Sequence, residues 1–324
     1  MTRPPPLADL SRVRTVPVAE RPNKVAAGDF AAAPPAAAEA RSFGAFLESL
    51  PDILQARAFL QVADAIAAAT RNQRATVWML GGHVVKTGLA PLVIDLMERG
   101  AVSHLASNGS AAIHDYEMAR WGGTSEDVEA GLADGSFGMA EETGRDMNRA
   151  FVAGLESGRG MGETLARDLD ARDDLAHPEL SLLLQAFRRG IPYTIHPAVG
   201  AEIIHQHPAA DGAAIGATGH RDFISFAGAL AGLDGGGVVL NVGSAVIMPE
   251  VFLKALTVAR NLGGGAPRGF VTCDLDMQLH YRPRVNVVER PTRTGNGRGY
   301  ALTGHHELMV PLLAWAVADR LEAQ

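Results

Sequence analysis

Apolar positions switch between helical and strand spacing along most of this chain. In residues 42–66 they recur every three or four positions, which predicts helices. Residues 76–80 form a short, continuous apolar run, the pattern of a buried strand. A helical stretch over 84–99 and a second short apolar run over 102–106 follow. Strand, helix and strand in this order predict a βαβ unit.

The same alternation returns in the second half of the chain. Residues 124–190 are mainly helical in pattern, with a cap at Thr124 and breaks at three glycines. Further strands are predicted at 191–195, 238–242 and 270–273, and further helices at 219–232, 247–260 and 305–321. The fold class is therefore α/β, with three layers: a mostly parallel sheet with helices on both faces. Such sheets bind ligands at the carboxyl ends of their strands.

The first forty residues lack this periodicity. Residues 1–40 contain two proline clusters and read as an N-terminal arm, either disordered or wrapped around a neighbouring subunit. Residues 41–324 are predicted to form a single domain.

Composition narrows the class of protein. The chain is 47% hydrophobic and 20% charged, with a net charge of −7, so neither nucleic acid nor an anionic membrane is an expected partner. No apolar run reaches the roughly 18 residues of a membrane span, and the N-terminus lacks the apolar stretch of a signal peptide, which predicts a cytoplasmic protein. The single Cys273 excludes an internal disulfide and a multi-cysteine metal site. Only three lysines are present, at 24, 86 and 254.

Three glycine turns follow predicted strands. Glycine allows a ligand to approach the backbone, helix N-termini attract phosphate, and Asn or Ser side chains can bind ribose. We therefore predict a dinucleotide site formed by Gly81, Gly82, Asn108, Gly109, Ser110, Gly243, Ser244 and the strand-end carboxylate Asp274. The alternative is that these glycines only separate strands from helices. No G-x-G-x-x-G motif follows the first strand, so an ordinary Rossmann dehydrogenase is not indicated.

The order of these segments resembles the deoxyhypusine synthase family, whose Rossmann-like NAD-binding fold is related to that of sirtuins. The similar segments are Gly88 to Ala101, Asn108-Gly109-Ser110 with His114-Asp115, Ile191 to Ala198, Val239 to Met248 and Leu308 to Ala316. The resemblance covers roughly residues 75–320 and implies NAD as cofactor, a homotetramer, and active sites shared between subunits.

One departure from the family bears on activity. In the family a lysine in a Trp-Gly-Lys motif carries a butylamine group as an imine, but here that position falls near Glu289-Arg290-Pro291. A guanidinium stays protonated and is no nucleophile. The family's paired histidines are replaced by Met248-Pro249-Glu250. The protein is therefore not expected to be a true deoxyhypusine synthase.

Histidines and carboxylates near the turns supply candidate catalytic groups. His114 and Asp115, with Glu117, follow the Asn108 turn and are expected to face a bound nicotinamide ribose. Glu141 and Glu142 either bind a cationic amine or complement a helix dipole.

A second group of candidates follows the strand predicted at 191–195. If residues 198–206 are helical, Glu202 and His205 share a face near His196, which suits proton transfer, metal binding or local hydrogen bonding. No zinc-hydrolase motif occurs, and no metal ligand is predicted.

These observations favour an NAD-dependent transferase or oxidoreductase that acts on a small amine-bearing substrate, a polyamine or an amino acid. Two alternatives stay open. One is a metal-assisted hydrolase or lyase that uses His196, Glu202 and His205. The other is a non-catalytic dinucleotide-binding assembly protein.

Overall fold

A six-stranded, fully parallel sheet forms the centre of the protein. The computed structural model describes residues 6–322. The strand order is β3-β2-β1-β4-β5-β6. The strands are β1 (Thr76–Leu80), β2 (His104–Asn108), β3 (Tyr193–His196), β4 (Val238–Val242), β5 (Val271–Asp276) and β6 (Arg298–Thr303). Strands β2 and β3 extend the sheet on one side of β1, whereas β4, β5 and β6 extend it on the other side. Doubly wound folds bind ligands at such a switch point, here between β1 and β4.

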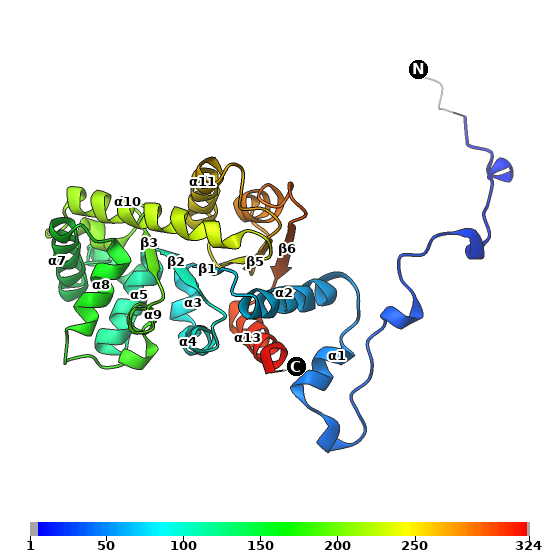
Figure 1. Ribbon diagram of the computed structural model, residues 1–324, viewed down its shortest axis with the longest axis horizontal. Helices are drawn as coiled ribbons and strands as arrows, with labels where there is room; N and C mark the ends of the chain where they lie inside the picture. The colour runs from blue at the N-terminus through cyan, green and yellow to red at the C-terminus, as the bar shows by residue number, and fades with distance from the viewer. Residues whose placement is uncertain (1–5, 323–324) are drawn as a thin grey trace.

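Helices cover both faces of the sheet (Figure 1). On β1, Trp78 and Leu80 point into one core and Val77 and Met79 into the other, so both faces are buried and the strand is apolar throughout. Helix α3 follows β1 on the first face, whereas α11 follows β4 on the second. The prediction of an α/β protein with a parallel sheet between helix layers is confirmed.

The α-helices are α1 (Phe43–Ser49), α2 (Leu54–Arg71), α3 (Gly82–Lys86), α4 (Ala90–Glu98), α5 (Gly109–Trp121), α6 (Val128–Asp134), α7 (Glu141–Ser157), α8 (Met161–Asp170), α9 (Leu182–Arg188), α10 (Gly212–Ala229), α11 (Ile247–Leu262), α12 (Tyr281–Pro283) and α13 (His306–Glu322). Short 3-10 turns are η1 (Leu10–Arg12), η2 (Val18–Glu20), η3 (Ala27–Asp29), η4 (Ala38–Ala40), η5 (Pro178–Leu180), η6 (Ile203–Gln206) and η7 (Leu230–Leu233), and η8 (Arg284–Glu289) is a π-helix. None of the described helices is long and apolar enough to cross a membrane.

Several predicted elements differ from the observed ones. The helix predicted over 84–99 is split into α3 and α4 by Gly88, whose φ of +80° cannot continue a helix. The predicted cap Thr124 is wrong, because Asp127 caps α6 by accepting a hydrogen bond from the Ala130 amide. Strand β6 was not predicted, and only η6 is helical within 198–206.

Candidate functional site

A cavity of about 770 Å³ opens beside the carboxyl end of β2. We call it the α5–α7 cavity, because α5 and the first turn of α7 form much of its wall. Four predicted site residues line it: Ser110, His114, Glu142 and Glu202. Lys86, Glu117, Thr124, Glu126 and Thr143 line it as well. The volume lies within the usual range for small-molecule sites.

One face of α5 supplies the cavity wall. Asn108 caps this helix, since its Oδ1 accepts a hydrogen bond of 3.2 Å from the Ala111 amide. Ser110, His114, Glu117 and Trp121 then follow at spacings of three or four residues and all line the cavity.

A chain of hydrogen bonds fixes the His114 ring. His114 Nδ1 lies 2.7 Å from Thr124 Oγ1, and the Thr124 hydroxyl donates to Glu117 Oε2 at 2.5 Å. The Thr143 hydroxyl donates to the other Glu117 oxygen at 3.0 Å. Because the one hydroxyl proton of Thr124 goes to the carboxylate, Thr124 can only accept from His114. Nδ1 therefore carries the imidazole proton, and Nε2 keeps its lone pair.

Burial and charge keep this imidazole neutral. Burial, with a smaller contribution from Lys86, lowers the pKa of His114 below its usual 6.5. Burial also raises the pKa of Glu117, opposed by the hydroxyls of Thr124 and Thr143. A neutral His114 with a free Nε2 has the chemistry of a general base.

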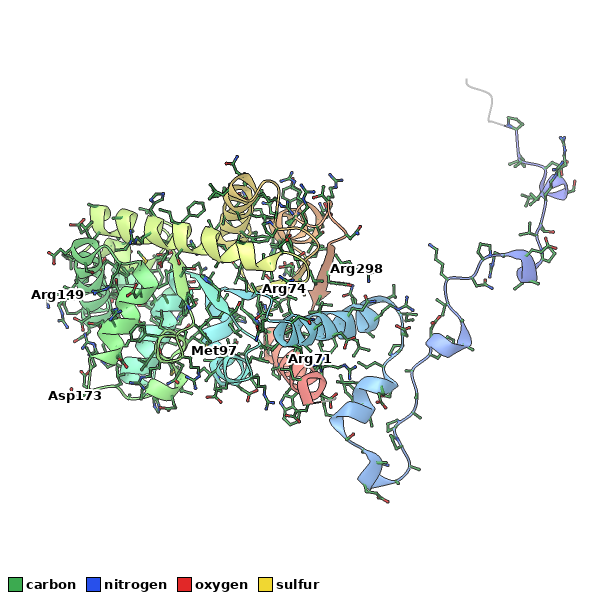
Figure 2. The ribbon with its side chains drawn as sticks, in the orientation of Figure 1. Arg71, Arg74, Met97, Arg149, Asp173 and Arg298 are labelled. Carbon is green, nitrogen blue, oxygen red and sulfur yellow. The ribbon has the colours of Figure 1, made fainter. Side chains whose placement is uncertain are left out.

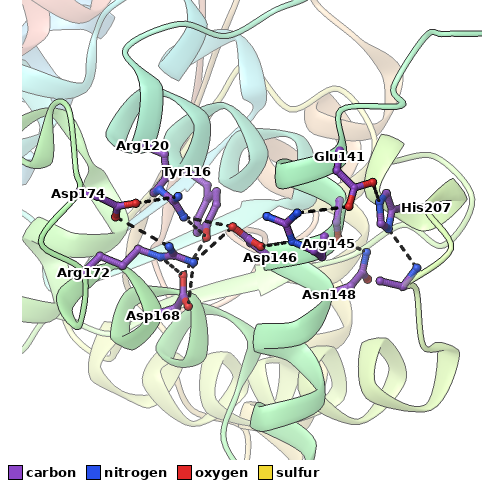
Figure 3. A network of polar contacts seen from close by, with 12 residues as sticks. Tyr116, Arg120, Glu141, Arg145, Asp146, Asn148, Asp168, Arg172, Asp174 and His207 are labelled. Carbon is purple, nitrogen blue, oxygen red and sulfur yellow. Dashed lines mark hydrogen bonds and ion pairs between the residues drawn. The ribbon is translucent and has the colours of Figure 1, made fainter.

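A partly buried ionic network holds α5 against α7 and α8 (Figure 3). Arg120 of α5 lies 3.3 Å from Asp146 of α7, and Arg172, just beyond α8, contacts both Asp146 and Asp168. The Tyr116 hydroxyl donates to Asp168 at 2.8 Å. The residues of this network lie outside the cavity. Their contacts nevertheless fix the positions of α5, which carries His114, and of α7, which carries Glu142.

The cavity is predominantly acidic. Glu117, Glu126, Glu142 and Glu202 line it, against one lysine, Lys86. Glu141 does not line it, because its carboxylate is exposed and contacts Arg145 at 3.3 Å and His207 at 3.4 Å. Glu141 is therefore removed from the candidate catalytic residues, and of the two interpretations only the helix-dipole one suits it.

Glu202 connects the β3 end to the start of α5. Its Oε1 accepts hydrogen bonds from the amides of Gly109 (3.2 Å) and Ala198 (2.8 Å). Its Oε2 is buried without a hydrogen-bond partner, 3.3 Å from His205 Nε2. Burial raises the pKa of Glu202 to about 7, against the effect of the two amides.

A second polar group lies at the ends of β4 and β5. We call Asn241, Asp274, Asp276, His83 and His306 the strand-end cluster. Asn241 Nδ2 donates to Asp274 Oδ1 at 2.8 Å, and burial raises the pKa of Asp274 to about 7. His306 Nε2 lies 3.7 Å from Asp276 Oδ1, and the rings of His83 and His306 are 5.3 Å apart.

Buried polar atoms of this cluster lack partners. Among the described residues, Asn241 Oδ1 has no hydrogen-bond partner, and the His306 ring nitrogens make no short hydrogen bond, although the Leu275 backbone and Asp276 lie close to the ring. Leaving such atoms unpaired costs on the order of 1–3 kcal/mol each. A ligand with hydroxyl or amide groups, as in a dinucleotide, would satisfy them, so these residues fit NAD.

The glycine turns are packed against protein atoms. A β-carbon on Gly81 would overlap the Gly243 carbonyl, and one on Gly243 would meet the His306 ring. Gly82 packs against Ser110 and His114, while Gly109 packs against Glu202, which also takes its amide. These glycines were expected to leave room for a phosphate. The space beside them is filled by neighbouring protein groups instead, so that interpretation is corrected. Likewise, Ser244 Oγ accepts from the Met248 amide at the start of α11.

Two predicted catalytic residues lie away from the cavity. Asp115 is fully buried and accepts hydrogen bonds from the Ser181 hydroxyl and from the amides of Leu182 and Leu183, so it holds the first turn of α9, whose N-cap is Ser181. His196 is buried against Phe226, with its Nε2 3.2 Å from Thr194 Oγ1. Burial lowers the pKa of His196 to about 3. Both predictions are corrected, because these side chains serve packing and capping.

The sequence did not indicate Thr124 as a partner of His114, and His306 was not among the predicted site residues. In the part of the chain that the structure covers, no three His, Cys, Asp or Glu side chains converge as a metal site. The group His196, Glu202 and His205, which the metal-assisted alternative would use, therefore does not converge in this way among the described side chains.

The comparisons give the fold but no family. No protein-family model and no curated protein sequence matches the chain. A conserved protein of Methanococcus maripaludis S2 assigned to LOR/SDH matches in structure with a TM-score of 0.51, at 13% identity, over 83% of this chain and 71% of its own. AgrE, in a ternary complex with ornithine and NAD+, matches with a TM-score of 0.50, at 16% identity, over 81% of this chain.

A protein of Entamoeba histolytica assigned as a deoxyhypusine synthase matches with a TM-score of 0.48, at 10% identity, over 87% of this chain and 94% of its own. The chain spans only 33% of AgrE. At these identities the similarity shows the fold alone.

Proposed function

We propose that this protein is an NAD-dependent enzyme that acts on a small amine-bearing substrate bound in the α5–α7 cavity. The observation that carries the proposal is the chain Glu117–Thr124–His114, which leaves a neutral imidazole with a free Nε2 in an acidic cavity beside the β1–β4 crossover. The fold is shared with AgrE, whose structure contains ornithine and NAD+.

His114 takes the proton in this proposal. Its Nδ1–H is held by Thr124, so Nε2 accepts a proton from the substrate and the imidazolium is stabilised through Thr124 by the Glu117 carboxylate. The role of NAD, when bound, is to accept a hydride. Oxidation of an amine carbon releases one hydride and one proton. The hydride would go to NAD, and His114 would accept the proton.

The acidic wall selects a cationic substrate. Glu142 is exposed to the cavity at the first turn of α7, and Glu117, Glu126 and Glu202 add carboxylates to the lining. Carboxylates pair with substrate ammonium groups. Lys86 favours an amino acid over a polyamine, because a carboxylate would pair with Lys86 whereas a polyamine would bring only like charge.

The strand-end cluster would hold the cofactor. Asn241 Oδ1 would accept from a hydroxyl or amide donor, and His306 would offer one ring nitrogen beside it. No lysine occupies the stretch near Glu289-Arg290-Pro291, so a family-type lysine imine has no place there.

Calorimetric titration of NAD tests the cofactor assignment. We expect saturable binding to the wild type and an affinity at least about tenfold lower in His306→Phe, which keeps the ring volume but loses both nitrogens. His220→Phe, at an exposed position, is the control. Absence of NAD binding to the wild type overturns the proposal. Tight binding without turnover of any polyamine or amino acid would instead indicate the non-catalytic alternative.

A further inference from the structure

The N-terminal arm, residues 6–41, projects away from the folded body (Figure 1). Its large apolar side chains are exposed: Leu7 is 97%, Leu10 77%, Val13 60% and Val16 67% accessible. Figure 2 shows the side chains of this segment standing clear of the body. Exposed apolar groups gathered in this way mark an interaction segment.

The spacing of these residues gives the arm one apolar side. Leu7, Leu10, Val13 and Val16 recur at every third position. Residues Leu10–Arg12 form a 3-10 turn, and Val13 and Pro17 have polyproline-like backbone angles. A 3-10 turn has three residues per turn, so Leu10 and Val13 lie on one side, and Leu7 and Val16 continue the same spacing along the chain.

The arm is fixed only at its base. The Asp52 amide donates to the Asp29 carbonyl and the Ala32 amide to the Ser49 carbonyl, each at 3.0 Å. Among the described residues, no hydrogen bond or ion pair joins residues 6–28 to the body. The apolar side therefore has no partner within its own described chain.

An apolar groove lies at the other end of the body. We call it the α8–α10 groove: a hollow of about 690 Å³ beside β3, lined by Ala166, Leu183, Phe187, Ile191 and Ile224 among others. At Arg221 and Ile224 it continues into a second hollow of about 290 Å³. Ile224 is 56% exposed. The two hollows form one elongated trough suited to an extended segment.

We propose that residues 7–16 of one copy bind in the α8–α10 groove of a second copy. The arm leaves from the end of the body formed by α1 and α2, whereas the groove lies between α8 and α10 at the opposite end (Figure 1). Two copies packed side by side in opposite directions would each place an arm at the partner's groove. Such an exchange is self-complementary and closes as a dimer.

The charges of the arm and of the body also favour the arm as the segment that binds in the groove. Residues 1–41 contain six basic and four acidic residues, whereas the whole chain carries −7, so the body is acidic and the arm is not. Arg12 and Arg14 flank the apolar side. The groove is lined by Glu163, which pairs with Arg167 at 2.8 Å, and by Asp222 and Arg221, so it is the difference in net charge between arm and body that favours this contact. Opposite charges at the rim of an apolar contact favour its formation and its register.

The mass of the full-length protein in solution, measured by light scattering, tests the proposal. We expect the wild type to be at least dimeric. Leu10→Asp and the exposed groove variant Ile224→Asp should each weaken dimerisation at least about tenfold, because each buries a charge in an apolar contact. Ala26→Asp, at an exposed arm position off the apolar side, is the control and should leave the mass unchanged.

A disulfide cross-link tests whether the arm of one copy contacts the groove of another. With Val13→Cys and Ile224→Cys in one chain, we expect a disulfide between two copies under non-reducing conditions, while buried Cys273 stays unreactive. A disulfide within one chain, a monomeric wild type, or an unchanged mass of Leu10→Asp would each overturn the proposal. Because NAD and amine binding lie elsewhere, failure here leaves the proposed chemistry intact.

Discussion

His114 Nδ1 lies 2.7 Å from Thr124 Oγ1, although the two residues are ten positions apart and Thr124 lies in the loop after α5. This contact determines which imidazole nitrogen faces the cavity as a base. Thr124→Val keeps the shape of the side chain but removes the hydroxyl, so the ring loses its defined tautomer. We expect kcat to fall about 10- to 100-fold with little change in KM. Thr124→Ser should recover most of the rate, and an equal loss in both variants would contradict this role.

Glu142 and Glu141 form a matched pair on α7. Only Glu142 lines the cavity, whereas Glu141 contacts Arg145 and His207 outside it. Glu142→Gln should raise KM for the amine substrate about tenfold, because a charged hydrogen bond becomes a neutral one. Glu141→Gln should change KM less than twofold. If the two variants changed KM equally in steady-state kinetics, the substrate amine would not bind at Glu142.

The ionic network around Arg120 should determine stability. Arg120 and Asp146 are 8% and 10% exposed, and Arg120→Met removes one of three guanidinium partners of Asp146, which keeps Arg145 and Arg172. We expect the free energy of unfolding in urea to fall by about 1.5–3 kcal/mol. Arg188→Met removes an exposed pair with Asp170 and should cost about 1 kcal/mol or less. Similar losses in the two variants would contradict the structural role of the network.

Glu202 makes stability depend on pH. Burial raises its pKa from 4.5 to about 7, so the folded state binds a proton more tightly than the unfolded state does. The contribution of Glu202 to the free energy of unfolding therefore falls as pH rises from about 4.5 to 7. Glu202→Gln stays neutral, so its stability relative to wild type should increase by up to about 3 kcal/mol between pH 5 and 8.

Urea unfolding at several pH values measures this difference. Glu156→Gln, at an exposed position, should follow the wild-type curve. Parallel curves for Glu202→Gln and wild type would show that Glu202 is ionised in both states.

Short apolar runs were enough to predict most of the sheet. The bounds of β1 and β4 were predicted as observed, because buried parallel strands are continuously apolar and glycines follow them. Strand β6 escaped prediction because its residues, Arg298–Thr303, are mostly half-buried at the edge of the sheet and lack an apolar run.

The helical spacing of α5 could have shown which candidate residues line the cavity and which point into the core. His114 lies on the face of α5 that Ser110 and Glu117 share, whereas Asp115 is about 100° further round and points into the core. By contrast, the Thr124 contact and the unpaired atoms of His306 depend on tertiary packing. Local sequence carries no signal for either.

Consumption of amines, followed by mass spectrometry with and without NAD, tests the central claim most directly. The panel holds polyamines and basic amino acids, and the variants are wild type and His114→Gln. We predict that the wild type consumes at least one amine only when NAD is present. His114→Gln should bind NAD equally well but react about 10²- to 10⁴-fold more slowly. Turnover at the wild-type rate in His114→Gln, or turnover by the wild type without NAD, would contradict the account.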